Sequence, residues 1–199
     1  YPVLINSGND RYPMITEFIS NQFNHVIVCV PLKEDTVWLE CTSQNMPAGS
    51  IGWSNENRNA LMITPDGGVV VKTPVSSSIK NLQTKKFEVT ISARGLADAK
   101  GNIVWGGNQH DYVNPVYKDF PLDEKEKWIK NLPNVPDVKL NEYNFNPLTE
   151  LESGIELNLD LSFPKYGSVT GNRLFFYPNL LERKLTAPSV VEERLSPIR

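Results

Sequence analysis

Two residues in the first quarter of the chain, His25 and Glu40, have the types and the spacing of a catalytic base and the acid that orients it. His25 opens a β-branched run that ends at Pro31, and Glu40 lies at the end of a second run that starts at Thr36. The loop 32–35 between them predicts an antiparallel hairpin whose paired positions sum to roughly 65–67. Side chains alternate between the faces of a strand, so Glu40 is expected opposite or diagonal to His25. A carboxylate there would fix the imidazole tautomer and stabilise the protonated ring.

The same spacing also fits an ordinary cross-strand pair with no chemical role. A catalytic triad further needs a nucleophile within about 3 Å of the imidazole. Cys29 shares a face with His25, but four residues along a strand span about 13 Å. Cys41 directly follows Glu40 and therefore points to the opposite face, and no serine lies in a G-x-S-x-G turn. The sequence thus predicts a base and an acid without their nucleophile.

The residues around the pair resemble the His-to-Asp segment of the transglutaminase-like (papain-related) superfamily. The matching runs are F-N-H-V-I-V-C-V-P-L at 23–32 and T-V-W-L-E-C-T-S at 36–43. His25 corresponds to the catalytic histidine of that family, and Glu40 stands where an aspartate orients it. The resemblance implies thiol acyl transfer or amide hydrolysis on peptide or protein amides, without metal or other cofactor, by a cysteine at a helix start upstream. Glutamate in place of aspartate is a departure, because its extra methylene shifts the carboxylate.

Two tryptophans are candidate walls of a cleft near the pair. Trp38 lies two residues before Glu40 and on its face, although packing in the core would explain it equally well. Trp53 lies in a glycine-flanked segment, where it either rims a groove or anchors a loop. His110 lies in a loop rich in hydrogen-bonding groups and is expected at the surface.

The elements expected around these residues are mostly strands, because 15 prolines and 12 glycines separate short apolar runs. Strands are predicted over 1–6, 24–31, 36–42, 59–64, 68–73, 84–93, 155–163, 168–176 and 189–195, with helices over 12–20 and 122–132. A linker at 73–78 divides the chain into residues 1–75, an α+β half of a transglutaminase-like core, and residues 76–199, a β-sandwich with one short helix. The expected fold class is therefore mainly β.

Downstream segments extend the resemblance to one bacterial arrangement, in which such a core is followed by an uncharacterised β-sandwich domain. The segments are Gly67–Pro74, Trp128–Lys130, Pro164–Tyr166, Thr170–Phe175 and Pro178–Leu180. That arrangement implies a periplasmic or cell-surface protein. Tyr1–Ile5 resembles the strand that follows the cysteine-bearing helices, and the last predicted strand has no turn signal after it. We therefore expect a fragment whose first sheet leaves one face open to another chain or to an N-terminal part.

Composition excludes several classes of function. Twenty basic and 23 acidic residues give a net charge of −3, which argues against nucleic-acid binding. No apolar run approaches the roughly 18 residues of a membrane span. Two cysteines, expected as free thiols, and two histidines form no zinc pattern, so no metal or cofactor is expected. Two function classes remain. The chain is either half of a thiol enzyme, inert alone, or a non-catalytic envelope module with a degenerate core. Such a module would bind glycan, peptide or a partner chain, or it would serve as a spacer.

Overall fold

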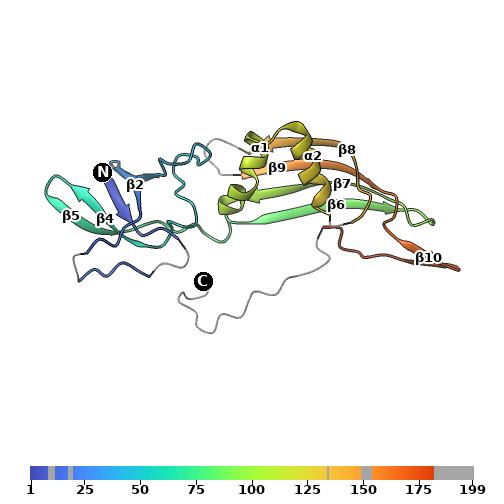
Figure 1. Ribbon diagram of the computed structural model, residues 1–199, viewed down its shortest axis with the longest axis horizontal. Coiled ribbons are helices and arrows are strands. Elements are labelled where there is room, and N and C mark those ends of the chain that lie inside the picture. Colours follow the sequence, from blue (N-terminus) through green and yellow to red (C-terminus); the bar gives the residue numbers. More distant parts are fainter. Residues whose placement is uncertain (9–11, 18–19, 134, 149–153, 182–199) are drawn as a thin grey trace.

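The computed structural model describes residues 1–8, 12–17, 20–133, 135–148 and 154–181 of the chain. It is mainly β, as the sequence predicts, and its strands form two antiparallel sheets that follow one another along the chain, with one additional short hairpin (Figure 1). The boundary expected near residue 75 falls between the last strand of the first sheet and the first strand of the second.

The first sheet has five strands in the order β3-β2-β1-β4-β5. They are β1 (Pro2–Ile5), β2 (His25–Pro31), β3 (Thr36–Leu39), β4 (Asn59–Thr64) and β5 (Gly67–Lys72). In the β2–β3 hairpin, Val28 pairs with Leu39 and Pro31 with Thr36, so paired positions sum to 67, within the predicted range. The β4–β5 hairpin turns through Pro65 and Asp66, and Gly67, the first residue of β5, has a φ of 123°, a conformation that favours glycine.

The two faces of this sheet differ in how they are covered. The covered face contributes Val3, Ile5, Ile27, Cys29 and Ala60 to a buried cluster with Ile51 from a loop. The open face carries apolar side chains on all five strands, because the positions that alternate with the buried ones are also apolar. Four of them are more than a third exposed: Val26 (45%), Val30 (36%), Ile63 (37%) and Val70 (48%). Among the described residues, the first sheet therefore leaves one apolar face open, as expected.

The second sheet has four strands in the order β6-β7-β9-β8. They are β6 (Gln83–Ile91), β7 (Ala97–Gly106), β8 (Lys139–Pro147) and β9 (Gly154–Phe163). The alternation predicted in β9 is confirmed, since its apolar residues from Ile155 to Phe163 are at most 4% exposed. They form the centre of the larger of the two cores.

Helices cover the apolar face of the second sheet (Figure 1). They are the 3₁₀ helix η1 (Gly107–Tyr112), α1 (Asn114–Lys118) and α2 (Leu122–Asn131). Ile129 of α2 is fully buried, and the Trp128 ring lies 6.1 Å from the Trp105 ring of β7. In the described residues the second layer is thus helical, where a β-sandwich with one helix is expected. The sequence does not predict this layer, because alternation along a strand shows that one face of the sheet is buried but not whether strands or helices cover that face.

Three further elements differ from expectation or lie outside the description. The described residues of the segment 12–20 form no helix; Ile15 is 56% exposed, so no buried surface supports one there. The single strand expected over 168–176 is a hairpin of β10 (Ser168–Thr170) and β11 (Arg173–Phe175), which turns at Gly171 with a φ of 60°. The strand predicted over 189–195 lies outside the described residues. No helix within the described ranges is both long and apolar enough to cross a membrane.

Candidate functional site

The predicted pair is in direct contact. Nε2 of His25, at the start of β2, lies 2.7 Å from Oε2 of Glu40, one residue beyond the end of β3. The side chain of Glu40 is 6% exposed and that of His25 is 21% exposed. Because Nε2 contacts the carboxylate, Nδ1 is the ring nitrogen left for a reacting group. None of the residues that the structure describes forms a hydrogen bond with Nδ1.

Glu40 is held as a carboxylate by several donors. Oε1 accepts hydrogen bonds from the backbone N–H of Thr42 at 2.8 Å and from its hydroxyl at 2.6 Å. Burial alone raises the pKa of Glu40, but the hydrogen bonds from Thr42 and His25 outweigh it, so the pKa lies below its ordinary value. An ionised carboxylate only accepts hydrogen bonds, so Nε2 of His25 is the donor in this contact. The neutral ring then has its lone pair on Nδ1, where a general base needs it.

Asn55 is a member of the site that the sequence does not reveal. Its Nδ2 donates to Oε2 of Glu40 at 3.1 Å and to the carbonyl of Ile51 at 2.8 Å. The residue is 2% exposed, and its Oδ1 is buried without a hydrogen-bond partner among the described residues. The backbone carbonyl of Asn55 accepts a bond from the hydroxyl of Thr73 at 2.6 Å, which ties this position to the end of the first sheet.

The loop that carries Asn55 is built from tight turns. Gly52 has a φ of 71° and Asn57 a φ of 57°, a left-handed conformation that glycine and asparagine tolerate best. The backbone N–H of Asn55 donates to the carbonyl of Gly52 at 3.1 Å. Nε of Arg58 donates to the carbonyl of Ser54 at 2.6 Å, which closes the loop from its other end. The turns thus place the Asn55 amide against Glu40.

The two tryptophans lie in different surroundings. Trp38 is opposite Cys29 on the covered face, where it is partly buried against the core cluster. Trp53 lies in the turn before β4 and is 42% exposed. Their roles as walls of a cleft remain a prediction.

Neither cysteine completes the pair. Cys29 and Cys41 are both free thiols, as expected. Cys29 is 3% exposed, and burial raises the pKa of its thiol, which makes it a weak nucleophile. Cys41 is exposed, and its sulfur contacts the carbonyl of Leu39 at 3.9 Å. Within the described residues, no thiol or hydroxyl is bonded to His25.

His110 is not at the surface, and that expectation is wrong. It lies in η1 with 6% exposure, and its Nδ1 is 3.4 Å from Oδ1 of Asp111. The neighbouring Asn108 is 7% exposed and bonds to Glu56, so η1 packs against the first part of the chain. This contact buries polar residues that local sequence gives no reason to bury.

Comparisons of this chain with family models, curated proteins and solved structures return no significant match. The geometry of His25, Glu40 and Asn55 is therefore the observation from which a function is inferred.

Proposed function

We propose that this chain supplies the base and the orienting acid of a thiol-dependent site for acyl transfer or hydrolysis of peptide or protein amides. The supporting observation is the 2.7 Å contact between Nε2 of His25 and Oε2 of a carboxylate that Thr42 and Asn55 also hold. A ring fixed in this way presents Nδ1 as a proton acceptor, and Glu40 stabilises the imidazolium that forms.

The proposed thiol comes from polypeptide outside this chain, in line with the transglutaminase-like resemblance. Its proton passes to Nδ1 of His25, and the thiolate attacks the amide carbon. When the tetrahedral intermediate collapses, the C–N bond breaks and the amine leaves with the proton from Nδ1. Water or a second amine then attacks the thioester and gives a proton to Nδ1 of His25, the C–S bond breaks, and the thiolate that leaves takes this proton back. Because Cys29 and Cys41 do not contact His25, the 199-residue chain alone is expected to be inert.

The glutamate is compatible with this role. The sequence raises the concern that the longer side chain displaces the carboxylate. Glu40 lies one residue past the strand end, and its Oε2 still approaches Nε2 of His25 to 2.7 Å. The added methylene therefore does not prevent the orienting contact.

The test uses the complete reading frame that contains this chain. Incorporation of a fluorescent amine into a glutamine-containing peptide and hydrolysis of peptide amides are measured for the whole polypeptide and for the 199 residues alone. We expect activity only in the former, abolished by iodoacetamide, with kcat/KM lowered about 10²–10⁴-fold by His25→Ala. Lys33→Gln, in the exposed β2–β3 loop, is the control and should leave activity unchanged. The proposal fails if the reading frame encodes no cysteine besides Cys29 and Cys41, or if the chain alone is active.

We further propose a periplasmic or cell-surface location in bacteria, on the resemblance of the downstream segments. Fractionation of cells expressing the complete reading frame tests it. Recovery in the periplasmic or outer-surface fraction supports this location, and recovery with cytoplasmic markers contradicts it.

A binding module without catalysis is the second candidate. It is favoured by the absence of a thiol near His25 in the described residues and by a hollow at the junction of the two parts of the chain. Under this alternative, His25→Ala affects stability but not binding.

A further inference from the structure

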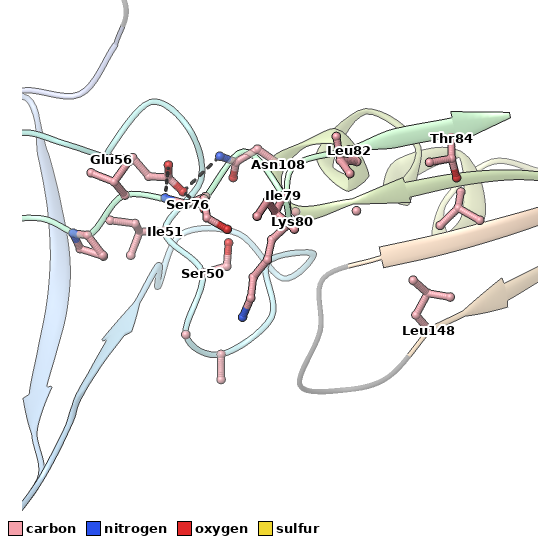
Figure 2. A pocket seen from close by; sticks show the side chains of 18 residues that line it. Ser50, Ile51, Glu56, Ser76, Ile79, Lys80, Leu82, Thr84, Asn108 and Leu148 are labelled. Carbon is pink, nitrogen blue, oxygen red and sulfur yellow. Dashed lines mark hydrogen bonds between the residues drawn. The ribbon is translucent and has the colours of Figure 1, made fainter. Parts of the chain in front are cut away.

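A hollow of about 710 Å³ lies where the first part of the chain meets the second (Figure 2). Its lining comes from the loop 48–51 with Glu56, the linker 74–77, residues 79–84, the end of β7 with the residues up to Asn108, and Leu148 just after β8. Its volume is within the range of small-molecule sites, roughly 300–1,000 Å³. We name it the junction hollow.

Aliphatic side chains form much of its wall and remain open to solvent. Their exposed fractions are 51% for Val75, 82% for Ile79, 50% for Leu82 and 41% for Leu148. Single exposed apolar residues are normal, but four around one hollow form a surface on which an apolar group would be buried. The wall therefore suits the apolar body of a ligand.

Lys80 gives this wall a positive charge. It is the one Lys or Arg among the described residues that line the hollow, and no described residue forms an ion pair with its ammonium group. Figure 2 shows the side chain extending past Ser50 and away from Glu56. Glu56 also lines the hollow, where its carboxylate accepts from the backbone N–H of Ser76 at 2.9 Å, from the Ser76 hydroxyl and from Asn108 at 3.1 Å. An incoming carboxylate thus meets a cation that no described residue holds in an ion pair.

The backbone that carries Lys80 is fixed in place. Its N–H donates to the carbonyl of Ser77 at 3.0 Å, and the N–H of Gly106 in β7 donates to the carbonyl of Leu82 at 2.8 Å. A Cβ at Gly106 or Gly107 would lie 2.9 Å from the carbonyl oxygen of Lys80, so these glycines permit the close approach. The backbone positions of Lys80 and Leu82 are consequently fixed relative to β7.

We propose that the junction hollow binds an apolar carboxylate, with its acid group on Lys80 and its aliphatic body against Ile79, Leu82 and Leu148. Two sources have this chemistry: a free fatty acid and the C-terminal residue of a peptide. The site does not include His25 or Glu40, so it stands apart from the proposed thiol chemistry.

The test is titration calorimetry with defined probes on the 199-residue chain. Octanoate represents the fatty acid, acetyl-Ala-Ala-Leu with a free C-terminus represents the peptide, and the corresponding neutral amides are the controls. We expect at least one carboxylate to bind about tenfold or more tightly than its amide, and Lys80→Gln to remove that difference. Ile79→Ser should weaken the carboxylate and the amide alike, without unfolding the protein, because this side chain is 82% exposed.

Matched variants separate this proposal from the catalytic one. Lys33→Gln removes a distant exposed lysine and should leave binding unchanged, and so should His25→Ala. Binding of octanoate alone, of the peptide alone or of both supports the proposal and identifies the source. It is overturned if neither carboxylate binds, or if Lys80→Gln binds both carboxylates as tightly as the natural sequence.

Discussion

At the scale of single residues, the site depends on a carboxylate that is buried yet ionised. Glu40 has four donors around it, two from Thr42 and one each from His25 and Asn55. They compensate the loss of water that burial causes. The charge of Glu40 should therefore influence stability as well as the orientation of His25.

The pH dependence of stability tests the ionised state of Glu40. Its pKa in the folded protein lies below the ordinary value of 4.5, so its contribution is present above pH 4.5 and is lost as the pH falls through the folded pKa. Unfolding free energies from urea titrations between pH 6 and pH 3 should decline less steeply for Glu40→Gln than for the natural sequence. Glu34→Gln, in the exposed loop, is the control and should retain the original slope. If the unfolding free energy depended on pH equally steeply in all three proteins, this would contradict a lowered pKa of Glu40 in the folded protein.

Asn55 should prove essential for the position of Glu40. Asn55→Ala removes two hydrogen bonds from a buried amide, and we expect a loss of about 1–3 kcal/mol in unfolding free energy. Asn55→Asp places a second carboxylate beside Glu40, so it should be more destabilising at pH 7 than at pH 4, where protonation relieves the repulsion. Chemical denaturation at both pH values measures this. If Asn55→Asp were equally destabilising at the two pH values, this would argue against a contact between residue 55 and Glu40.

At the scale of elements, local patterns predict much of the framework. The β2–β3 hairpin, its register and the contact of His25 with Glu40 follow from alternation and a short loop. The strand β9 and the helix α2 also follow from periodicity. The partner Asn55 does not, because its position depends on how a loop closes. Nor does the layer formed by η1 and α1, since residues 107–118 show no apolar period and become buried only through tertiary contacts.

The open face of the first sheet gives a prediction at this scale. Replacing Val26 and Val70, which are 45% and 48% exposed, by threonine retains β-branching and removes apolar surface. We expect reduced binding of the dye ANS, with unfolding free energy changed by less than about 0.5 kcal/mol. Ile27→Thr, on the covered face, is the control and should be strongly destabilising. A loss of more than about 1.5 kcal/mol in the double variant would show that other parts of the protein cover this face.

At the scale of the whole molecule, the segment between β3 and β4, which carries Glu40 and Asn55, also forms hydrogen bonds to the second part of the chain. Asn45 in this region donates to Asp119 at 3.1 Å, and Asn114 donates to the carbonyl of Asn45 at 2.6 Å. Glu56, next to Asn55 in sequence, is bonded to Ser76 and Asn108. The candidate site and the junction hollow therefore share a supporting loop.

Removing this connection should loosen the linker. Glu56→Ala eliminates the acceptor for Ser76 and Asn108, so residues 74–78 should be cleaved several-fold faster in limited proteolysis, as local opening becomes easier. Mass spectrometry of the fragments locates the cuts. Glu34→Ala serves as the control, and an unchanged rate at 74–78 in Glu56→Ala would contradict a role for Glu56 at the junction.

If His25 is the base for a thiol, the rate at which that thiol is alkylated depends on the imidazole. In the complete polypeptide, the reaction of the proposed catalytic cysteine with iodoacetamide at pH 6 is followed by mass spectrometry. We expect a rate about tenfold or more lower in His25→Ala, because the imidazole no longer draws the proton from the thiol, with a smaller decrease in Glu40→Gln. The same rate in all three proteins would contradict it.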